Sequence, residues 1–298
     1  MAREHSFGAL DRQGTLIFRE CVMAIIAMTR EMATLGRDVA AGLAERLGLD
    51  IVHHELVAQD IAERAGMRES EVQRFLGGEA SLLARWRVDR ARVSRYTAEE
   101  ILELAVKGNV LIRGWGATYL LRNVPHVLCV RICAPMADRE RVLMQRLGID
   151  DAATARREIE RNDAAHNGTM QRLFGIDWTD PALYALVLNT ARIHVADCVE
   201  HIVKVAESAA FQETAESRMS LSDQLILSKV HSSLDRRFGS STSALGIDAE
   251  VAAGKVVLKG ALSDERMIVE TVRLMYTIPG VQAVESRISH IAFSRESD

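Results

Sequence analysis

The sequence has few cysteines, little net charge and no long apolar run, and each shortage excludes a class of protein. Its four cysteines form no C-x-x-C pair, which argues against a zinc site, and Cys129 and Cys133 are too near each other in one strand-like segment to suggest a disulfide framework. The formal net charge of −4 gives no general attraction for nucleic acid or an anionic membrane. No segment reaches the roughly 18 apolar residues of a membrane span, and the first twenty residues lack the pattern of a secretory signal. These absences predict a cytoplasmic globular protein that does not bind nucleic acid.

Residues 22–47 have the pattern of a strand, a loop and a helix. Residues 22–28 form a nearly continuous apolar run, which is typical of a strand buried on both faces. After the loop TREMATLGRD, the apolar residues Val39, Leu43 and Leu47 recur every four positions, as on the buried stripe of a helix. P-loop proteins hold phosphate in such a turn, because backbone N–H groups and the helix dipole both face the anion.

The Walker A pattern G-x-x-x-x-G-K-[ST] fits this loop only in part. Its defining positions fall on Glu31, Gly36, Arg37 and Asp38. One glycine therefore remains, arginine replaces the lysine, and aspartate replaces the hydroxyl that binds magnesium. From the spacing alone, a degenerate phosphate loop and an ordinary strand–loop–helix stay equally open.

The rest of the first two thirds alternates between apolar strands and helical segments. Further strands are predicted at 109–114, 126–133 and 185–190, with a long charged helical region at 138–167. Strands that alternate with helices indicate the α/β class, with a doubly wound parallel sheet.

The last third of the chain has a different character. A polar stretch without periodicity predicts a linker, and the elements after it predict a small α+β unit of αββαβ order. Those elements are a helix at 223–238, strands at 247–251 and 256–260, a helix at 264–275 and a strand at 283–290. The expected organisation is an N-terminal extension at 1–20, an α/β domain at 21–208, a linker at 209–220 and a second domain at 221–292.

Several motifs occur in the order that is typical of one known family. The loop 29–37, TREMATLGR, is similar to that family's S-R-E-Y-G-S-G-G-R, and residues 48–56, GLDIVHHEL, are similar to its G-I-P-Y-Y-D-R-E-L. Residues 112–117 stand where it has I-V-G-R-G-A, and residues 175–181 and 186–190 are similar to T-G-x-x-W-x-D and L-x-L-N-T. Residues 21–208 thus resemble the cytidylate kinase-like family of P-loop nucleoside monophosphate kinases. This resemblance implies ATP, Mg²⁺ and a CMP-like monophosphate as ligands.

The resemblance also implies which side chains serve the site. Those in a catalytic role are Arg37, Arg157, Arg161 and Asp163. Those that bind nucleotide or phosphate are Arg30, Thr34, Gly36, Arg37, Asp38, Glu55, Gly114, Trp115, Arg139 and Arg141. Asp38 is also the candidate ligand for Mg²⁺.

Several positions depart from the family pattern, which leaves three hypotheses. The loop residues 32–35 lack glycine, His53 and His54 replace Asp and Arg, Trp115 replaces an arginine, and His166 replaces another arginine in the lid. Loss of one such group commonly lowers a rate by about 10²–10³. The first hypothesis is therefore a degenerate nucleotide-binding protein with a regulatory or sensory role. The alternatives are an active kinase for CMP, dCMP or a related monophosphate, and an interaction protein with an empty pocket.

Residues 221–291 resemble a BON domain. The matching residues are Gly254, Val256, Leu258 and Gly260 of a central hairpin, followed by residues 279–281, Pro-Gly-Val, and by Val284. BON domains resemble interaction modules, which implies a protein partner, a membrane surface or self-association into a homo-oligomer. A few exposed lysines contribute about 1 kcal/mol each to membrane binding, so a membrane attachment here would be weak.

Overall fold

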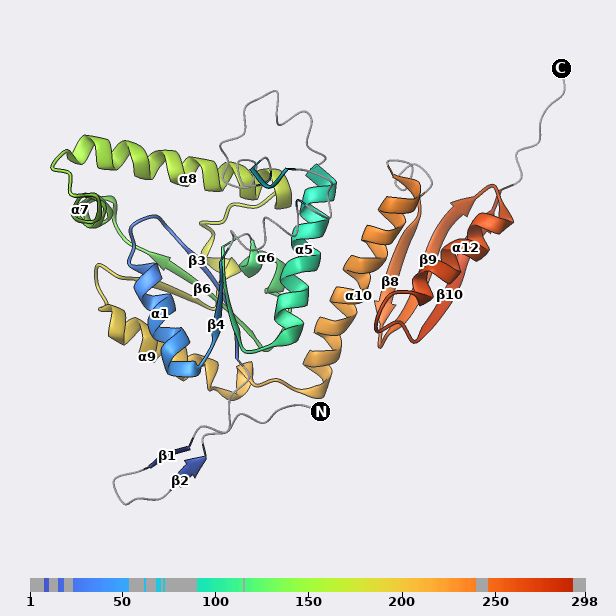
Figure 1. Ribbon diagram of the computed structural model, residues 1–298, viewed down its shortest axis with the longest axis horizontal. Coiled ribbons are helices and arrows are strands. Elements are labelled where there is room, and N and C mark those ends of the chain that lie inside the picture. Colours follow the sequence, from blue (N-terminus) through green and yellow to red (C-terminus); the bar gives the residue numbers. More distant parts are fainter. Residues whose placement is uncertain are drawn as a thin grey trace. The chain divides into compact units, whose positions relative to one another are not determined.

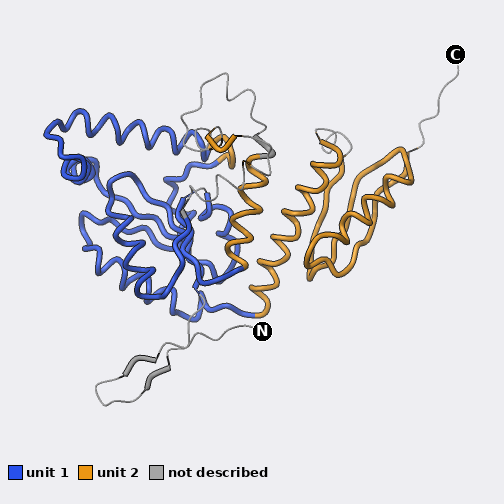
Figure 2. Tube along the Cα trace, viewed as in Figure 1, with its two compact units in different colours: residues 1–56, 107–170, 176–214 blue, residues 57–106, 171–175, 215–298 orange. Residues whose placement is uncertain are grey.

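The computed structural model describes residues 24–53, 90–114, 116–239 and 246–291, the backbone of 8–10 and 16–18, and the isolated residues 62, 68–70 and 72. The chain divides into two compact units, which Figure 2 colours separately. The first comprises residues 1–56, 107–170 and 176–214, and the second comprises 57–106, 171–175 and 215–298. The predicted boundaries at 208 and 221 stay a prediction.

The first unit is built on a parallel sheet. In the described part of this unit five strands lie in the order β4-β5-β3-β6-β7 (Figure 1). They are β3 (Ile25–Arg30), β4 (Asp50–His53), β5 (Val110–Arg113), β6 (Val127–Cys133) and β7 (Leu186–Asn189). All the pairings are parallel, which confirms the predicted α/β sheet. Because β3 is central and the chain crosses it between β5 and β6, the carboxyl end of β3 is the switch point where ligands bind in such sheets.

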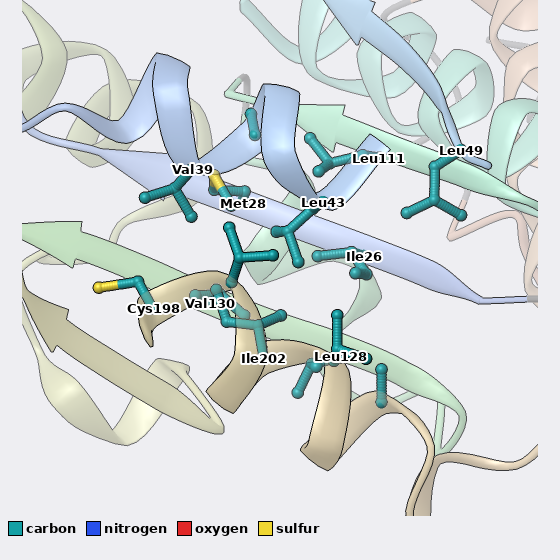
Figure 3. Packing of buried hydrophobic residues seen from close by; sticks show 14 of the residues in the cluster. Ile26, Met28, Val39, Leu43, Leu49, Leu111, Leu128, Val130, Cys198 and Ile202 are labelled. Carbon is teal, nitrogen blue, oxygen red and sulfur yellow. The ribbon is translucent and has the colours of Figure 1, made fainter. Parts of the chain in front are cut away.

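Helices cover the two faces of this sheet. Its helices are α1 (Gly36–Leu47), α6 (Ala117–Leu121), α7 (Met136–Leu147), α8 (Ala152–Phe174) and α9 (Val195–Ala206). Ile26 and Met28 of β3 pack with Leu43 of α1 and Ile202 of α9 in one apolar core (Figure 3). On the alternate side of β6, the Cys129 thiol donates to the Thr118 carbonyl of α6 at 3.3 Å. The predicted helical region 138–167 is thus two helices, with Gly148 ending α7 at a φ of 65°.

The second unit contains α5 (Arg90–Lys107) and the C-terminal elements. After α5 these are α10 (Ala215–Phe238), β8 (Asp248–Ala252), β9 (Lys255–Leu262), α12 (Glu265–Tyr276) and β10 (Ala283–His290). The sheet order is β10-β9-β8, with β8 antiparallel and β10 parallel to β9. From α10 onward the order is helix–strand–strand–helix–strand, as predicted. Its core includes Ile226 and Val230 of α10, Leu258 of β9 and Met275 of α12.

The predicted linker differs from the structure. Helix α10 begins at Ala215 rather than at Asp223, and a short 3₁₀ turn, Ala209–Phe211, precedes it. Ser217 lies buried in the first part of α10 beside the buried Leu221. A serine at a buried position hides the apolar period of a helix, so the sequence suggested an aperiodic stretch.

Near the N-terminus, β1 (Gly8–Leu10) pairs antiparallel with β2 (Leu16–Phe18). In the part of the chain that the structure describes, none of the helices has the length and apolar character needed to cross a membrane.

Candidate phosphate-binding site

The loop between β3 and α1 has a backbone that normally requires glycine. Ala33 and Leu35 have φ angles of 60° and 57°, in the left-handed region. This region costs L-amino acids other than glycine roughly 1–2 kcal/mol. The loop motif of the resembling family, S-R-E-Y-G-S-G-G-R, has glycine at both positions. Ala33 and Leu35 therefore adopt a backbone conformation that glycine adopts more readily.

The same loop carries backbone N–H groups without acceptors. Five N–H groups of the loop donate no hydrogen bond to any described residue. They belong to Met32, Ala33, Leu35, Gly36 and Arg37. Helical bonding starts only with Asp38 and Val39, whose N–H groups donate to the Leu35 carbonyl at 3.0 and 3.1 Å. Buried amides without partners are rare, and Ala33 and Gly36 are buried. Successive free N–H groups of this kind suit an anion.

The carbonyl groups of the loop are bonded instead to the protein. Thr34 Oγ1 donates to the Glu31 carbonyl at 2.8 Å, and Thr190 Oγ1 donates to the Thr34 carbonyl at 2.7 Å. Arg139 Nε donates to the Met32 carbonyl at 2.8 Å. These bonds fix the loop so that its N–H groups, rather than its carbonyl groups, remain available.

A buried charge network lies beneath the loop. Arg131 Nη2 contacts Glu31 Oε1 at 2.5 Å, and Arg139 Nη1 lies 3.6 Å from Glu31 Oε2. Arg139 also contacts Asp163 Oδ1 of α8 at 2.8 Å. The side chains of Glu31, Arg131 and Arg139 are 12%, 11% and 5% exposed. Glu31 therefore links the loop to β6 and α7, and Arg139 continues the link to α8.

Arginines without a carboxylate partner surround the loop. Burial, followed by the charges of Arg113, Arg37 and Arg146, lowers the pKa of Arg30 to about 10. Within the described residues, none of Arg30, Arg37 and Arg146 forms an ion pair with a carboxylate. A Cβ atom on Gly36 would lie 2.8 Å from Arg30 Cδ, so glycine at this position leaves room for the Arg30 side chain. These arginines place positive charge, unpaired within the described part of the chain, beside the loop.

The structure gathers only some of the predicted site residues. Arg30, Thr34, Gly36 and Arg37 lie in the loop and the first turn of α1, and Gly114 bonds to β3 through its N–H and the Met28 carbonyl at 2.9 Å. Asp38 is exposed in the first turn of α1. Glu55 and Trp115 lie outside the described residues, as does His54, and the same holds for the side chain of His53.

The predicted lid residues lie apart from the loop contacts or already have partners. Arg139 and Asp163 bind each other, and Arg139 supports the loop rather than facing a ligand. Three exposed arginines pair with neighbouring residues in the chain: Arg141 with Asp138, Arg157 with Asp151 at 3.8 Å, and Arg161 with Glu158 at 2.9 Å.

Sequence reasoning missed the residues that hold the site together. Arg131 stands alone in the apolar strand β6, and a charged residue there signals a buried partner.

The His166 ring packs edge-to-face on Trp178, with ring centroids 4.3 Å apart, and the Arg131 guanidinium lies 5.3 Å from the Trp178 ring. Burial lowers the pKa of His166 to about 4; Asp163 opposes the shift and Arg30 adds to it.

A central parallel strand that runs through such a loop into a helix defines the P-loop class of α/β protein. A family model described as the cytidylate kinase-like family matches residues 25–192. The chain belongs to the cytidylate kinase-like family.

The sequence identity to individual relatives is low. The chain is 25% identical over 178 residues to a cytidylate kinase of Pyrococcus horikoshii, covering 57% of this chain and 85% of that protein. It is 29% identical over 162 residues to a cytidylate kinase of Methanopyrus kandleri, covering 52% and 78%. A crystal structure of an uncharacterized protein from Eubacterium ventriosum aligns with a TM-score of 0.48 and 20% identity, covering 62% of this chain and 99% of that one.

The buried network makes a first prediction. Glu31→Gln keeps the side-chain size but leaves Arg131 and Arg139 without their shared charge. Breaking a buried pair in this way costs about 3–5 kcal/mol of unfolding free energy, which urea denaturation measures. Glu158→Gln, which removes an exposed partner of Arg161, is the control and should cost less than about 1 kcal/mol. Equal losses in the two variants would contradict the role of Glu31.

The depressed pKa of His166 gives a second prediction. The unfolded chain binds a proton at this residue near pH 6.5, whereas the folded protein resists it until about pH 4. Stability is therefore complete above pH 6.5 and is lost as the pH falls through about 4. The free energy of unfolding, measured between about pH 7 and pH 4, should fall more steeply for the wild type than for His166→Gln. Parallel pH profiles would refute a folded-state His166 that stays neutral to about pH 4.

Proposed function

We propose that this protein binds a nucleotide through its phosphates at the loop 31–37 and serves a regulatory or sensory role as a degenerate member of its family. The observation that carries the proposal is the run of loop N–H groups that have no acceptor in the described chain, while the loop carbonyls bond to Thr34, Thr190 and Arg139. A loop fixed in this way provides hydrogen-bond donors to an anion at no further cost in ordering.

The degenerate character is supported by what the site lacks. Phosphoryl transfer depends on positioned cations around the transferred group. Arg157 and Arg161 are exposed and paired with neighbouring residues, and Arg139 is buried under the loop. The Thr34 hydroxyl bonds within the loop. Among the predicted catalytic residues, Arg37 alone stands beside the free N–H groups, which favours binding over turnover.

The alternative function is phosphate transfer from ATP to CMP or a related monophosphate. Family membership favours it, because the relatives reported above are cytidylate kinases and the chain spans most of their length. In this alternative Arg157, Arg161 and Asp163 would move to the ligand when it binds. Measured turnover separates the two proposals.

A nucleotide titration tests the proposal. ATP, CMP and dCMP should include at least one ligand that raises the melting temperature and gives a measurable Kd by calorimetry. Arg37→Ala should weaken that binding about 10- to 100-fold, because a charge-assisted hydrogen bond contributes about 1.5–3 kcal/mol. Arg46→Ala, at the exposed far end of the same helix, should leave the Kd unchanged.

Two results would contradict the proposal. Turnover at an ordinary kinase rate, about 1–100 s⁻¹, would replace the degenerate protein with the active kinase. No thermal shift and no heat with any nucleotide would favour the third hypothesis, an interaction protein with an empty pocket.

We further propose that residues 221–292 are a BON domain that reports the ligand state to a partner. The αββαβ order supports the assignment. On the open side of its sheet, Lys255 pairs with Glu285 at 2.5 Å, and Lys259 pairs with Glu250. Paired charges of both signs favour a protein partner or a second copy over an anionic membrane.

A link between the two parts of the sequence supports the coupling. Helix α5 lies within the family-matched residues, yet it forms ion pairs with α10 inside the second unit. Arg95 contacts Asp235 at 2.5 Å, and Lys229 contacts Glu103 at 2.7 Å. These pairs are partly buried, so they hold the helices in one arrangement. Helix α5 continues through Gly108 into β5, which ends beside the loop strand β3.

Hydrogen exchange tests this coupling. Nucleotide should change the exchange of residues 215–238 in the wild type, and Asp235→Asn should abolish that change because it removes the charge that holds Arg95. Lys259→Ala breaks an exposed pair of the same unit and should leave the response intact. A wild-type α10 that ignores a bound nucleotide would contradict the coupling.

A further inference from the structure

We infer that the loop takes the phosphates of its ligand as a free anion, with Arg30, Arg37 and Arg146 in place of magnesium. The inference rests on the proposed nucleotide binding and concerns only how the phosphate charge is neutralised. It departs from the magnesium chemistry that the family implies, because the described side chains around the loop do not suit that ion.

The hydroxyl group that a P-loop offers to magnesium is missing. The corresponding position is Asp38. The hydroxyl of the loop itself, on Thr34, belongs to a side chain that is 1% exposed, and it donates to the Glu31 carbonyl at 2.8 Å. Thr34 is therefore committed to the loop conformation and cannot face a cation beside the free N–H groups.

The nearby carboxylates are also committed. Glu31 contacts Arg131 at 2.5 Å and Arg139 at 3.6 Å, and Asp163 contacts Arg139 at 2.8 Å. Magnesium in phosphate-binding sites takes one or two carboxylates besides phosphate oxygens and water, in strict octahedral geometry. Among the described carboxylates of the loop and the first turn of α1, Asp38 remains, on an exposed helical turn. Over the described residues, no three side chains of His, Cys, Asp or Glu converge to hold an ion.

The charge around the loop already has the sign that a phosphate needs. Arg30 extends from the end of β3 over Gly36, where a Cβ atom would lie 2.8 Å from its Cδ. The charges of Arg113, Arg37 and Arg146 act on Arg30 and lower its pKa, after the larger effect of burial. Gathering the like charges of Arg30, Arg37 and Arg146, none of which forms an ion pair with a carboxylate among the described residues, costs free energy that a bound polyanion recovers. The same charges repel a divalent cation.

Neutralising Asp38 changes the affinity for the anion in opposite directions in the two modes of binding. If Asp38 ligates magnesium, its neutralisation weakens binding. If the anion binds without magnesium, the positive end of the α1 dipole attracts the phosphate. The Asp38 carboxylate in the first turn of α1 then only repels it. Removing its charge then strengthens binding.

Calorimetry with ATP and with inorganic tripolyphosphate, each in EDTA and in excess MgCl₂, tests the inference on the full chain. The wild type should bind both probes in EDTA at least as tightly as with magnesium. Asp38→Asn should bind them about two- to fivefold more tightly. Glu45→Gln makes the same charge change at the exposed far end of α1 and should leave the Kd unchanged.

Binding that is tenfold tighter with magnesium in the wild type, and that loses this gain in Asp38→Asn, would overturn the inference and leave nucleotide binding standing. Failure of both probes to bind under either condition would instead overturn nucleotide binding itself, and the inference with it.

Discussion

The Glu31 carboxylate joins the loop after the central strand to two other elements of the sheet domain. It accepts from Arg131 of β6 and lies near Arg139 of α7, which in turn bonds to the Met32 carbonyl and to Asp163. Buried ion pairs of this kind contribute little net stability, because desolvation offsets their attraction. What they provide here is geometry. They hold the loop while Ala33 and Leu35 keep left-handed backbone conformations.

The held loop explains the division of its polar groups. Carbonyl groups bond to Thr34, Thr190 and Arg139, and N–H groups are left over. An active kinase of the family would show the same pattern of bonded carbonyl groups and free N–H groups. Glycine residues there would lower the free-energy cost of the left-handed backbone conformation. In this chain the loop N–H groups have no acceptor among the described residues, while Arg157 and Arg161 pair with their own neighbours. Selection for binding without fast turnover would produce such a pattern.

Periodicity predicted the elements well and the site less well. The apolar run 126–133 located β6 because parallel strands buried on both faces are nearly continuously apolar, and the run 185–190 located the less buried strand β7. The early start of α10 was missed because Ser217 occupies a buried helical position. The ion-pair partners of arginines on charged helices could not be predicted, because they depend on side-chain rotamers that residue spacing does not specify. The pair of Arg157 with Asp151 is an example. The left-handed backbone of Leu35 was also not predicted from the sequence. A large side chain in place of glycine suggested that the phosphate-loop conformation was absent, rather than kept under strain.

We propose that the N–H groups of Met32, Ala33, Leu35, Gly36 and Arg37 form an anion site. Backbone amide NMR of the full protein during a titration with inorganic phosphate and then ATP measures this directly. The largest chemical-shift changes should fall on the amides of these five residues. Unchanged resonances for these amides at saturating ATP would contradict it.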